Sequence, residues 1–549
     1  MRSLGFIFAV LIAVVSGGAS IACKSNSRSN GNGNDSSAVS DTVDYLIVAA
    51  DGLSASAARY RDFRGASGFH VDLAMVGEIV GDAADAATAS ARIRAHVQSR
   101  FDARDTSRPM FLLLLGDAQT VWPGDGSGVP TGTWTAPSTS AAVTSDNIYA
   151  DMDGDDVPDI AVGRITADSD ADADLVRGKV SNYESTHEIG VWDRRLNIFA
   201  STSGFGDVMD SAIESLVYDI TEAIPYGYDV AMTYARQSSP YVYIPEQFSD
   251  EVYRRINEGS LLVAYVGHGS PNGFATLDWS GVSYPILDIG QLDRLSVTHK
   301  SPILLFVACS TGAFAGSESV RERILAPPGA PTAIFASTED SDPYANAVFI
   351  YEVSQAFTVS RSPTVGETFL LAKQRMLKNN DSVRQTIDSM AGLLDTATVR
   401  DALKHSHLHM YTLFGDPGMA VVYAGSATKV SVNPSTASAG AELTVAATFP
   451  SVSSGAEAVV SLESARKVIL GGIATLPADG DSGRDGVIVK NYETANDKVA
   501  TSMTVSLTGS SLSTTLKIPP DLPAGQYHIK VFAHDTSNDF LGSASLTVN

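Results

Sequence analysis

The chain has little cysteine and a shortage of positive charge, and each of these excludes a class of protein. Only two of its 549 residues are cysteines, which excludes a disulfide-rich scaffold and a zinc site built from several thiolates. The 62 acidic residues outnumber the 38 lysines and arginines, so the formal net charge is −24. Binding to nucleic acid and electrostatic adsorption to anionic lipid both depend on an excess of basic side chains. We therefore expect no nucleic-acid partner.

Long hydrophobic runs are also scarce, and the one at the N-terminus predicts export. Arg2 precedes an apolar run at residues 4–15, which is shorter than the ~20 residues that cross a bilayer as a helix. Small residues follow, as in a secretory signal peptide, which we place at residues 1–22. The sequence Ser20-Ile-Ala-Cys23 resembles the lipobox of bacterial lipoproteins, in which the cysteine is acylated, although Ser20 stands where leucine is usual.

The segment that starts at the first cysteine is predicted to be a flexible tether. Residues 23–42 are rich in serine, asparagine and glycine, a composition that buries no hydrophobic core. We therefore expect Cys23 to be lipidated and the protein to be an exported lipoprotein of the cell envelope, at the outer membrane or the cell surface. Its contact with the membrane would run through this N-terminal lipid. The alternative is a secreted protein that is cleaved nearby and carries no lipid.

Residues 43–424 predict a layered α/β fold. Short apolar runs, such as residues 110–115, alternate with amphipathic stretches of helical period. Strand–helix–strand repeats at this spacing are typical of a parallel sheet covered by helices. A stretch at residues 121–143, rich in Gly, Pro, Ser and Thr, predicts a surface loop. We place a subdomain boundary just after this loop. It separates an N-terminal α/β subdomain at 43–145 from a second subdomain at 146–424.

The C-terminal region predicts an all-β domain. After about residue 423 the helical periodicity ends and short alternating runs follow, as at residues 442–446 and 502–507. Runs of this kind predict an immunoglobulin-like β-sandwich at 425–549. Antibody domains carry paired cysteines, which this region lacks, so the prediction concerns the architecture alone.

Two apolar runs end in reactive side chains. Residues 261–266 lead into Gly-His268-Gly-Ser, and residues 303–307 lead into Ala-Cys309-Ser-Thr-Gly. The carboxyl ends of parallel strands form the functional edge of an α/β sheet, where neighbouring strands bring a histidine and a cysteine within reach. A cysteine nucleophile needs such a base, because the thiolate makes the attack and a free thiol is mostly protonated at neutral pH.

The glycines around His268 add a second element to this arrangement. Without side chains they let a substrate backbone approach, and the amides of Gly269 and Cys309 are candidates for an oxyanion hole. Each signal has an ordinary alternative, since a lone buried cysteine is usually a small core residue and a Gly-His-Gly sequence is often a plain turn. The pair is more specific, because both residues follow comparable strands and both are bounded by small residues.

These segments also carry a family resemblance. Tyr265-Val-Gly-His-Gly-Ser270 and Phe306-Val-Ala-Cys-Ser-Thr-Gly312 resemble the two catalytic blocks of the gingipain-type cysteine peptidases, which belong to the caspase-like group. Three further segments resemble the family, at residues 112–117, 155–164 and 413–417. The resemblance covers about residues 43–424, and a β-sandwich after the catalytic part also fits it. It implies that the second subdomain is the caspase-like catalytic one.

The resemblance implies a Cys–His dyad that needs no cofactor for catalysis. Cys309 would be the nucleophile that forms a thioester acyl-enzyme, and His268 would act as general base and acid. Well-known members orient the histidine with a glutamate, where this sequence has Ser203. Members also use an acidic residue to bind a basic side chain of the substrate. The substrate-binding candidates near the comparable place are Asp207, Asp210 and Glu214.

An acidic loop precedes the Gly-Arg164 segment. Its carboxylates stand at positions 1, 3, 5 and 9 of the loop, in Asp151, Asp153, Asp155 and Asp159. Calcium binds six or more hard oxygen ligands on a tightly curving chain, and Gly154 helps the chain to curve. The spacing predicts a structural Ca²⁺ site, and the alternative is a solvated acidic turn.

A second group of possible metal ligands has a weaker pattern. His405, His407 and His409 alternate, but no cysteine or carboxylate constellation completes a zinc site around them. We therefore expect these histidines to have a surface or packing role.

Together these features predict an extracytoplasmic cysteine endopeptidase that acts on protein or peptide substrates, with cleavage after basic residues. One alternative is a sortase-like transpeptidase that processes exported proteins, because the same acyl-enzyme serves both reactions. The other is a non-catalytic cell-surface binding protein on a peptidase scaffold. Ser203 in place of glutamate supports this last alternative, whereas retention of both His268 and Cys309 opposes it.

Overall fold

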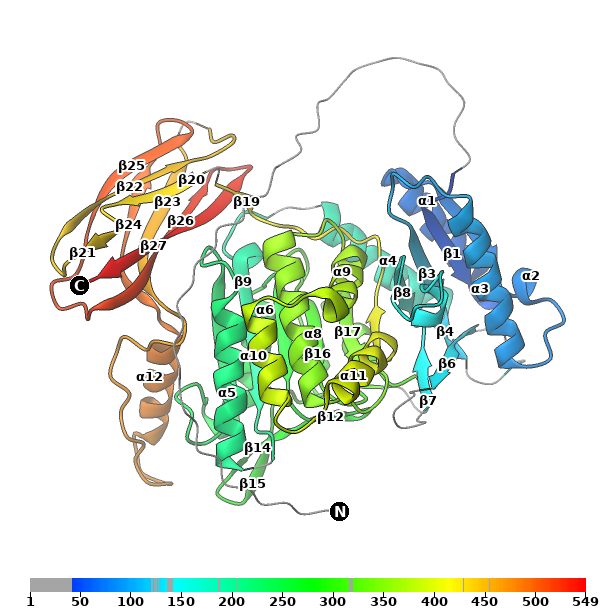
Figure 1. The fold of residues 1–549 in the computed structure, drawn as a ribbon, viewed down its shortest axis with the longest axis horizontal. Helices are drawn as coiled ribbons and strands as arrows, with labels where there is room; N and C mark the ends of the chain where they lie inside the picture. The colour runs from blue at the N-terminus through cyan, green and yellow to red at the C-terminus, as the bar shows by residue number, and fades with distance from the viewer. Residues whose placement is uncertain are drawn as a thin grey trace. The chain divides into compact units, whose positions relative to one another are not determined.

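The computed structural model in Figure 1 describes most of the chain after the predicted tether. The described residues are 42–549, apart from 120–121, 123–125, 127, 136–141, 186–187, 205, 315–318, 428, 454 and the side chains of residues 207–209, 212 and 213. The predicted signal peptide, Cys23 and the tether up to residue 41 lie outside them. Among the described residues, no helix is both long enough and apolar enough to cross a membrane.

A ten-stranded sheet forms the centre of the α/β region, in the order β10-β9-β11-β16-β17-β18-β8-β3-β1-β2. Its strands, in chain order, are β1 (Tyr45–Ala49), β2 (Val71–Met75), β3 (Phe111–Leu115), β8 (Ala161–Ile165), β9 (Arg195–Ser201), β10 (Asp229–Ala235), β11 (Leu262–Val266), β16 (Ile303–Val307), β17 (Ala333–Ser337) and β18 (Tyr411–Phe414). The layered α/β fold class predicted from the sequence is therefore confirmed.

The sheet consists of two parallel halves that run in opposite directions. Strands β10, β9, β11, β16 and β17 pair in parallel, as do β18, β8, β3, β1 and β2, and the halves meet at the antiparallel pair β17–β18. The carboxyl ends of β11 and β16 therefore lie at the opposite edge of the sheet from those of β1 and β3. Strands β8 and β18 join the half built by β1–β3 although they follow residue 145; the subdomain boundary there stays a prediction.

Helices cover both faces of the sheet (Figure 1). Ile303, Leu305 and Val307 of β16 belong to one buried cluster, whereas Leu304 and Phe306 belong to another on the opposite face. This alternation explains why the strand is apolar throughout. The helices are α1 (Ser54–Ala66), α2 (Val76–Val80), α3 (Ala86–Asp102), α4 (Asp170–Ser185), α5 (Asp207–Glu222), α6 (Phe248–Asn257), α7 (Val320–Leu325), α8 (Pro343–Gln355), α9 (Val365–Lys378), α10 (Ser382–Ala391) and α11 (Ala397–Met410).

Short strands decorate the loops between these elements. The segment expected to be a plain loop contains parts of two small sheets, β4–β5 and β6–β7. Two hairpins, β12–β13 and β14–β15, follow β11 directly. These strands are β4 (Asp117–Gln119), β5 (Gly128–Pro130), β6 (Gly132–Thr135), β7 (Ala142–Ser145), β12 (Gly269–Ser270), β13 (Gly273–Phe274), β14 (Thr276–Trp279) and β15 (Val282–Pro285).

Buried charged side chains join the segments that resemble family motifs. Arg164, which has no exposed surface, donates to the two carboxylate oxygens of Asp146 at 2.8 and 2.7 Å and also to the backbone carbonyl of Gly116. Gly163 beside it must be glycine, because a β-carbon there would lie 2.5 Å from the carbonyl oxygen of Gly415. These residues therefore hold the ends of β3, β8 and β18 against one another.

A second buried group of polar side chains surrounds Asp416. Its carboxylate accepts hydrogen bonds from the hydroxyls of Tyr45 and Tyr60 at 2.6 and 2.8 Å, and from Nε of Arg64 at 2.7 Å. Burial raises the pKa of both tyrosines well above the ordinary value, so they act as donors at all physiological pH values. These hydrogen bonds join α1 and β1 to the segment that follows β18.

The C-terminal region is a β-sandwich, as predicted. One sheet has the order β19-β27-β26-β23-β24, with β21 pairing with β27, and the other has the order β20-β22-β25. Its strands are β19 (Gly425–Ser426), β20 (Lys429–Asn433), β21 (Thr436–Ala437), β22 (Glu442–Thr448), β23 (Glu457–Ser464), β24 (Val499–Ser506), β25 (Ser511–Lys517), β26 (Gly525–His534) and β27 (Asp539–Val548).

One helix interrupts the sandwich where the sequence shows no helical periodicity. It is α12 (Arg484–Asn496), and it belongs to a segment at residues 465–498, which we call the strap, between β23 and β24. The strap contacts the edge of the ten-stranded sheet. Arg466 in it donates to the carbonyl oxygens of Thr221 and Ile224, at the carboxyl end of α5, at 2.6 Å each. Because the sequence shows no helical pattern here, we attribute the helix to the contacts that the strap makes in the tertiary structure.

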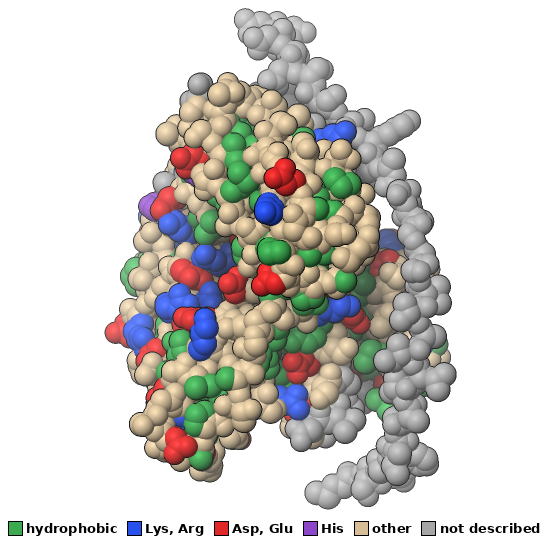
Figure 2. All heavy atoms as spheres, turned by 90° about the vertical axis from the view of Figure 1, so that its left-hand side faces the viewer, with side chains coloured by type: hydrophobic (Ala, Val, Ile, Leu, Met, Phe, Trp, Pro, Cys, Tyr) green, Lys and Arg blue, Asp and Glu red, His purple; other side chains and the backbone are tan. Residues whose placement is uncertain are grey.

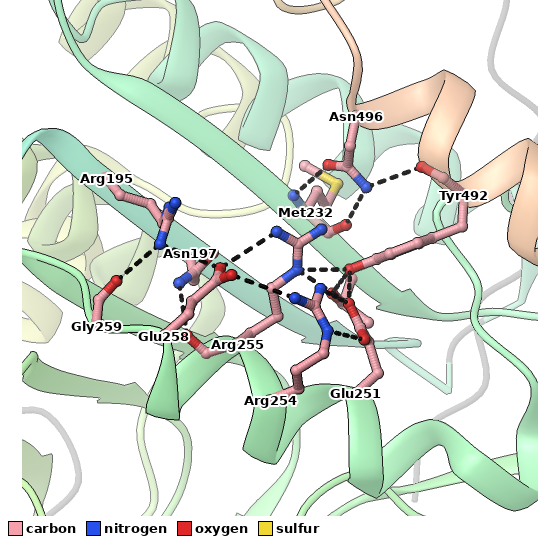
Figure 3. A network of polar contacts seen from close by, with 11 residues as sticks. Arg195, Asn197, Met232, Glu251, Arg254, Arg255, Glu258, Gly259, Tyr492 and Asn496 are labelled. Carbon is pink, nitrogen blue, oxygen red and sulfur yellow. Dashed lines mark hydrogen bonds and ion pairs between the residues drawn. The ribbon is translucent and has the colours of Figure 1, made fainter. Parts of the chain in front are cut away.

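The strap also covers the edge strand β10 (Figure 3). Asn496 accepts from the backbone N–H of Met232 at 2.8 Å and donates to its carbonyl at 3.0 Å, as a neighbouring strand would. Tyr492, one turn earlier, contacts Glu251 and Arg255 of α6 through its hydroxyl at 3.0 and 3.1 Å. An uncovered edge strand pairs readily with other chains, and the strap prevents this at β10.

Charge is distributed without large areas of one sign on the face that Figure 2 presents. Acidic and basic side chains are interspersed there, although acidic residues predominate in the whole chain. This pattern offers no continuous basic surface on that face for an anionic polymer.

Replacement of Asn496 by alanine tests the edge contact. The change leaves the N–H and C=O of the buried Met232 without partners, so we expect the free energy of unfolding to fall by about 1–3 kcal/mol in urea titrations. Asn538→Ala, at an exposed position of the sandwich, is the matched control and is expected to change stability by less than ~0.5 kcal/mol. Equal stability of the two variants would contradict the assigned role.

Candidate active site

The pairing of β11 with β16 brings His268 and Cys309 to the same place. The strands are parallel and in register, with Val266 opposite Val307, and the N–H of Gly267 donates to the carbonyl of Val307 at 3.2 Å. Each reactive residue stands two positions beyond this last pair. Because neighbouring strands lie only ~4.8 Å apart, both residues leave the sheet side by side at its carboxyl edge.

Gly269 packs the histidine loop directly against the cysteine turn. A β-carbon at Gly269 would lie 2.7 Å from Cγ2 of Thr311, 2.8 Å from Cβ of Ala308 and 2.9 Å from the carbonyl oxygen of Cys309. Any side chain would force the two loops apart, so glycine is required there for contact. This close approach is the feature that joins the two sequence motifs into one site.

The backbone amide of Gly269 points away from its hairpin. The N–H of Ala275 donates to the carbonyl of His268 at 3.1 Å, which makes these two residues a hydrogen-bonded pair. Gly269 and Phe274 are the next pair along β12–β13 and therefore a non-hydrogen-bonded one. The Gly269 N–H is consequently not used by the hairpin ladder, as an oxyanion-hole donor requires.

The segment after β17 holds the cysteine turn. The half-buried Cys309 accepts a hydrogen bond at Sγ from the N–H of Ser341 at 3.4 Å, and its Sγ lies 3.6 Å from the Ser341 carbonyl. Ser310, which adopts a left-handed conformation with φ of 52°, donates its N–H to Glu339 at 2.9 Å and its hydroxyl to Asp340 at 2.9 Å. Ser341 thus offers the sulfur both a backbone donor and a backbone acceptor.

Sequence reasoning did not identify Ser341 as part of the site. A signal was present, because polar residues follow β17 as they follow β11 and β16, and all three strands end at the same edge. Two of these strand ends carry groups of familiar catalytic type, and the third supplies a backbone amide, which leaves no mark in the sequence.

His268 is exposed and its ring contacts a backbone carbonyl. Nε2 lies 2.8 Å from the carbonyl oxygen of Ser203, the residue that stands where the sequence comparison expected a glutamate. The backbone N–H of His268 donates to the hydroxyl of Ser201 at 3.3 Å, and its carbonyl accepts from the hydroxyl of Tyr265 at 2.7 Å. The histidine loop is thus held at both backbone groups and at the ring.

The substrate-binding candidates on α5 have different surroundings. Asp210 is 5% exposed, and its Oδ1 accepts from both the N–H and the hydroxyl of Ser203 at 2.7 and 2.5 Å. Asp207 is the first residue of the helix, and its side chain lies outside the described part of the chain. Glu214 pairs with Arg236 at 3.3 Å and accepts from the hydroxyl of Tyr218 at 3.1 Å. A role for any of them in substrate binding stays a prediction.

The acidic loop brings together three of its four predicted calcium ligands. Carboxylate oxygens of Asp151, Asp153 and Asp159 all lie within 4.8 Å of one another. Asp155 is not in this group, and its Oδ1 accepts from the N–H of Val157 at 2.8 Å. Burial, together with repulsion from the neighbouring carboxylates, raises the pKa of Asp159. Three hard oxygens on one curved loop fit part of a calcium shell, which backbone carbonyls and water would complete.

The alternating histidines lie on α11, and two of them are buried. His407 Nε2 accepts from the N–H of Asp342 at 3.2 Å, while the His409 ring stacks on Trp134 with centroids 4.3 Å apart. Burial lowers the pKa of both to about 4, so both are neutral at pH 7. Among the described residues, neither belongs to a group of three candidate metal ligands.

Comparison with known proteins identifies the family. The sequence matches the profile of peptidase family C25 over residues 38–422. The fold is similar to the crystal structure of the Arg-specific cysteine proteinase gingipain R (RgpB), at 15% identity and a TM-score of 0.51, with 93% of this chain and 98% of that chain covered. No protein of curated function matches the sequence.

Two further solved structures are similar. One, described as a protease, has 15% identity and a TM-score of 0.52, with 92% of this chain and 97% of that chain covered. The other is the complex of Porphyromonas gingivalis RgpB pro- and mature domains, at 13% identity and a TM-score of 0.49, with 92% and 100% covered.

The profile spans most of the chain and nearly coincides with the region that resembles the gingipain type in sequence. That resemblance is thus confirmed, and the solved structures agree in fold. The chain therefore belongs to peptidase family C25, and it is a cysteine-type peptidase whose substrates are proteins or peptides.

Proposed function

We propose that the protein is an exported cysteine endopeptidase in which Cys309 and His268 are the catalytic dyad. The observation that carries this proposal is the packing of Gly269 against the Cys309 turn, at the end of two strands that pair in register. This packing supports the proposal because it brings the histidine loop, with its Gly269 amide, against the cysteine turn at the carboxyl edge of the sheet.

The proposed reaction has two halves that share an acyl-enzyme. The Cys309 thiolate attacks the scissile carbonyl carbon, and the amides of Gly269 and Cys309 donate to the resulting oxyanion. Protonated His268 transfers its proton to the leaving amine as the C–N bond breaks, which leaves a thioester on Cys309. A water molecule then attacks this thioester while His268 removes its proton, and the Cys309 thiolate departs. The amide of Ser341 stabilises the thiolate at the start and at the end of the cycle.

The substrate preference is proposed from a relative of similar fold. That relative, gingipain R, is Arg-specific. We therefore propose cleavage after basic residues. A sortase-like transpeptidase would form the same thioester and pass it to an amine in place of water, so analysis of the products distinguishes the two reactions.

We further propose that Cys23 carries the membrane anchor, on the strength of its lipobox-like sequence and the tether that follows. The protein would then act outside the cytoplasm at the cell envelope. The acidic loop would hold a structural Ca²⁺ through Asp151, Asp153 and Asp159, whose negative charges repel one another without a cation.

The dyad is tested by substitution and by an irreversible thiol-reactive peptide probe. Cys309→Ala and His268→Ala are each expected to lower kcat/KM by roughly 10⁴-fold or more, because nucleophile and base act as a unit. Probe labelling is expected to be lost in the first variant and strongly slowed in the second. Ser270→Ala, an exposed position in the same loop, is the matched control and should keep near-normal activity. Full activity of the Cys309→Ala protein would refute the mechanism.

Lipidation is tested by growing expressing cells with a radioactive fatty acid. We expect the protein to incorporate label and the Cys23→Ala variant to lose it, because the acyl chains attach to that residue. Incorporation that survives the substitution, or that is absent from the unmodified protein, would contradict the anchor.

The calcium site is tested by thermal unfolding with excess Ca²⁺ and with a chelator. A ligand that binds only the folded state at a hundred times its Kd stabilises it by ~2.7 kcal/mol, so we expect Tm to rise measurably with Ca²⁺. Asp153→Asn should abolish the rise, whereas Asp155→Asn should largely keep it, because the Asp155 carboxylate is not among the three that lie within 4.8 Å of one another. Equal Tm with Ca²⁺ and chelator would exclude the site.

A further inference from the structure

The contact between His268 and Ser203 defines which ring nitrogen carries a proton. A carbonyl oxygen only accepts hydrogen bonds, so Nε2, 2.8 Å from the Ser203 carbonyl, is the nitrogen that bears the hydrogen. In the neutral ring this leaves Nδ1 as the basic nitrogen. The backbone carbonyl of Ser203 therefore orients the ring and selects its tautomer.

Ser203 is itself held by a buried carboxylate. Oδ1 of Asp210 accepts both from the N–H of Ser203 at 2.7 Å and from its hydroxyl at 2.5 Å. Asp210 is 5% exposed and lies in the first turn of α5, so its position is fixed by the helix. The chain turns sharply after Ser203 through Gly204, which has φ of 71°. Two bonds to one oxygen thus fix the direction in which the Ser203 carbonyl points.

We propose that Asp210 is the positioning residue for His268 and acts through Ser203, an inference that rests on the proposed dyad. Asp210 anchors Ser203, and the Ser203 carbonyl orients the imidazole and selects its tautomer. Asp210 makes no contact with the reacting atoms in this scheme.

The scheme differs in its kinetic consequences from a substrate-binding role of Asp210. A carboxylate that bound a basic substrate side chain would, when neutralised, raise KM and lower the preference for basic residues. A positioning carboxylate would lower kcat with little change in KM, because the bound substrate is unaffected while the base is misaligned. It would also alter the titration of His268 in the absence of substrate.

The test combines steady-state kinetics with an NMR titration of the histidine. Asp210→Asn keeps the side-chain shape and removes the charge, and Ser203→Ala removes one of the two hydrogen bonds. Asp219→Asn, an exposed carboxylate on the same helix, is the matched control. The imidazole signals are recorded in the Cys309→Ala background, where no turnover occurs, and the His268 signal is assigned by its loss in His268→Gln.

We expect the imidazole signals of His268 to shift in the Asp210→Asn protein, since the carbonyl that selects the tautomer of the ring is no longer held in place. We also expect kcat to fall about 10- to 100-fold with KM nearly unchanged. Ser203→Ala should shift both in the same direction by a smaller amount, and Asp219→Asn should change neither. If Asp210→Asn fails to fold, the Ser203→Ala result decides.

Three results would overturn the proposal. They are an unchanged His268 titration in the Asp210→Asn protein, a change in KM alone, and a fall in kcat that tracks lost thermal stability without a shift of the histidine. Because the titration needs no activity, it tests the Asp210–Ser203–His268 chain even if the protein proves to have no Cys309-dependent peptidase activity, which would instead refute the proposed function.

Discussion

The in-register parallel pairing of β11 with β16 is the constraint on which the proposed site depends. It sets His268 and Cys309 equally far beyond the sheet, on strands that neighbour each other. A shift of one residue would move each side chain to the opposite face, because strand residues alternate between faces. The buried apolar side chains of both strands prevent such a shift, since each strand is packed on both faces. The geometry of the site is thus set mainly by the hydrophobic core beneath it.

The two halves of the sheet need other means to stay joined, because they run in opposite directions and meet at one antiparallel pair. Buried charged side chains join the two halves near this pair. Arg164 with Asp146, and Arg64 with Asp416 and two tyrosines, join the strand ends around β8 and β18. A buried ion pair of this kind is costly to break by removal of one partner, and it specifies one arrangement of the segments that it joins. The motifs that resemble the family outside the dyad therefore have a structural explanation.

The C-terminal sandwich makes direct contacts with the α/β region through its strap. Its strap covers the edge strand β10 with the side chain of Asn496 and caps the end of α5 with Arg466. The same helix α5 carries Asp210 at its other end, beside Ser203 and His268. Contacts of the sandwich thus anchor the helix whose Asp210 holds Ser203 beside the proposed base His268, which gives a physical reason for the sandwich to accompany the peptidase unit.

The sequence by itself determined the main order of strands and helices, the sandwich and the family, and it singled out His268 and Cys309 as the candidate dyad, because apolar periodicity and residue identity are local properties. Only the tertiary structure decided that the sheet reverses direction at β17–β18, that α12 forms within the sandwich, and that a carbonyl contacts the histidine. Each of these depends on residues far apart in the chain: Ser203 and His268 are separated by 65 positions. A backbone carbonyl is present in every residue, so no sequence pattern distinguishes the one that orients the base.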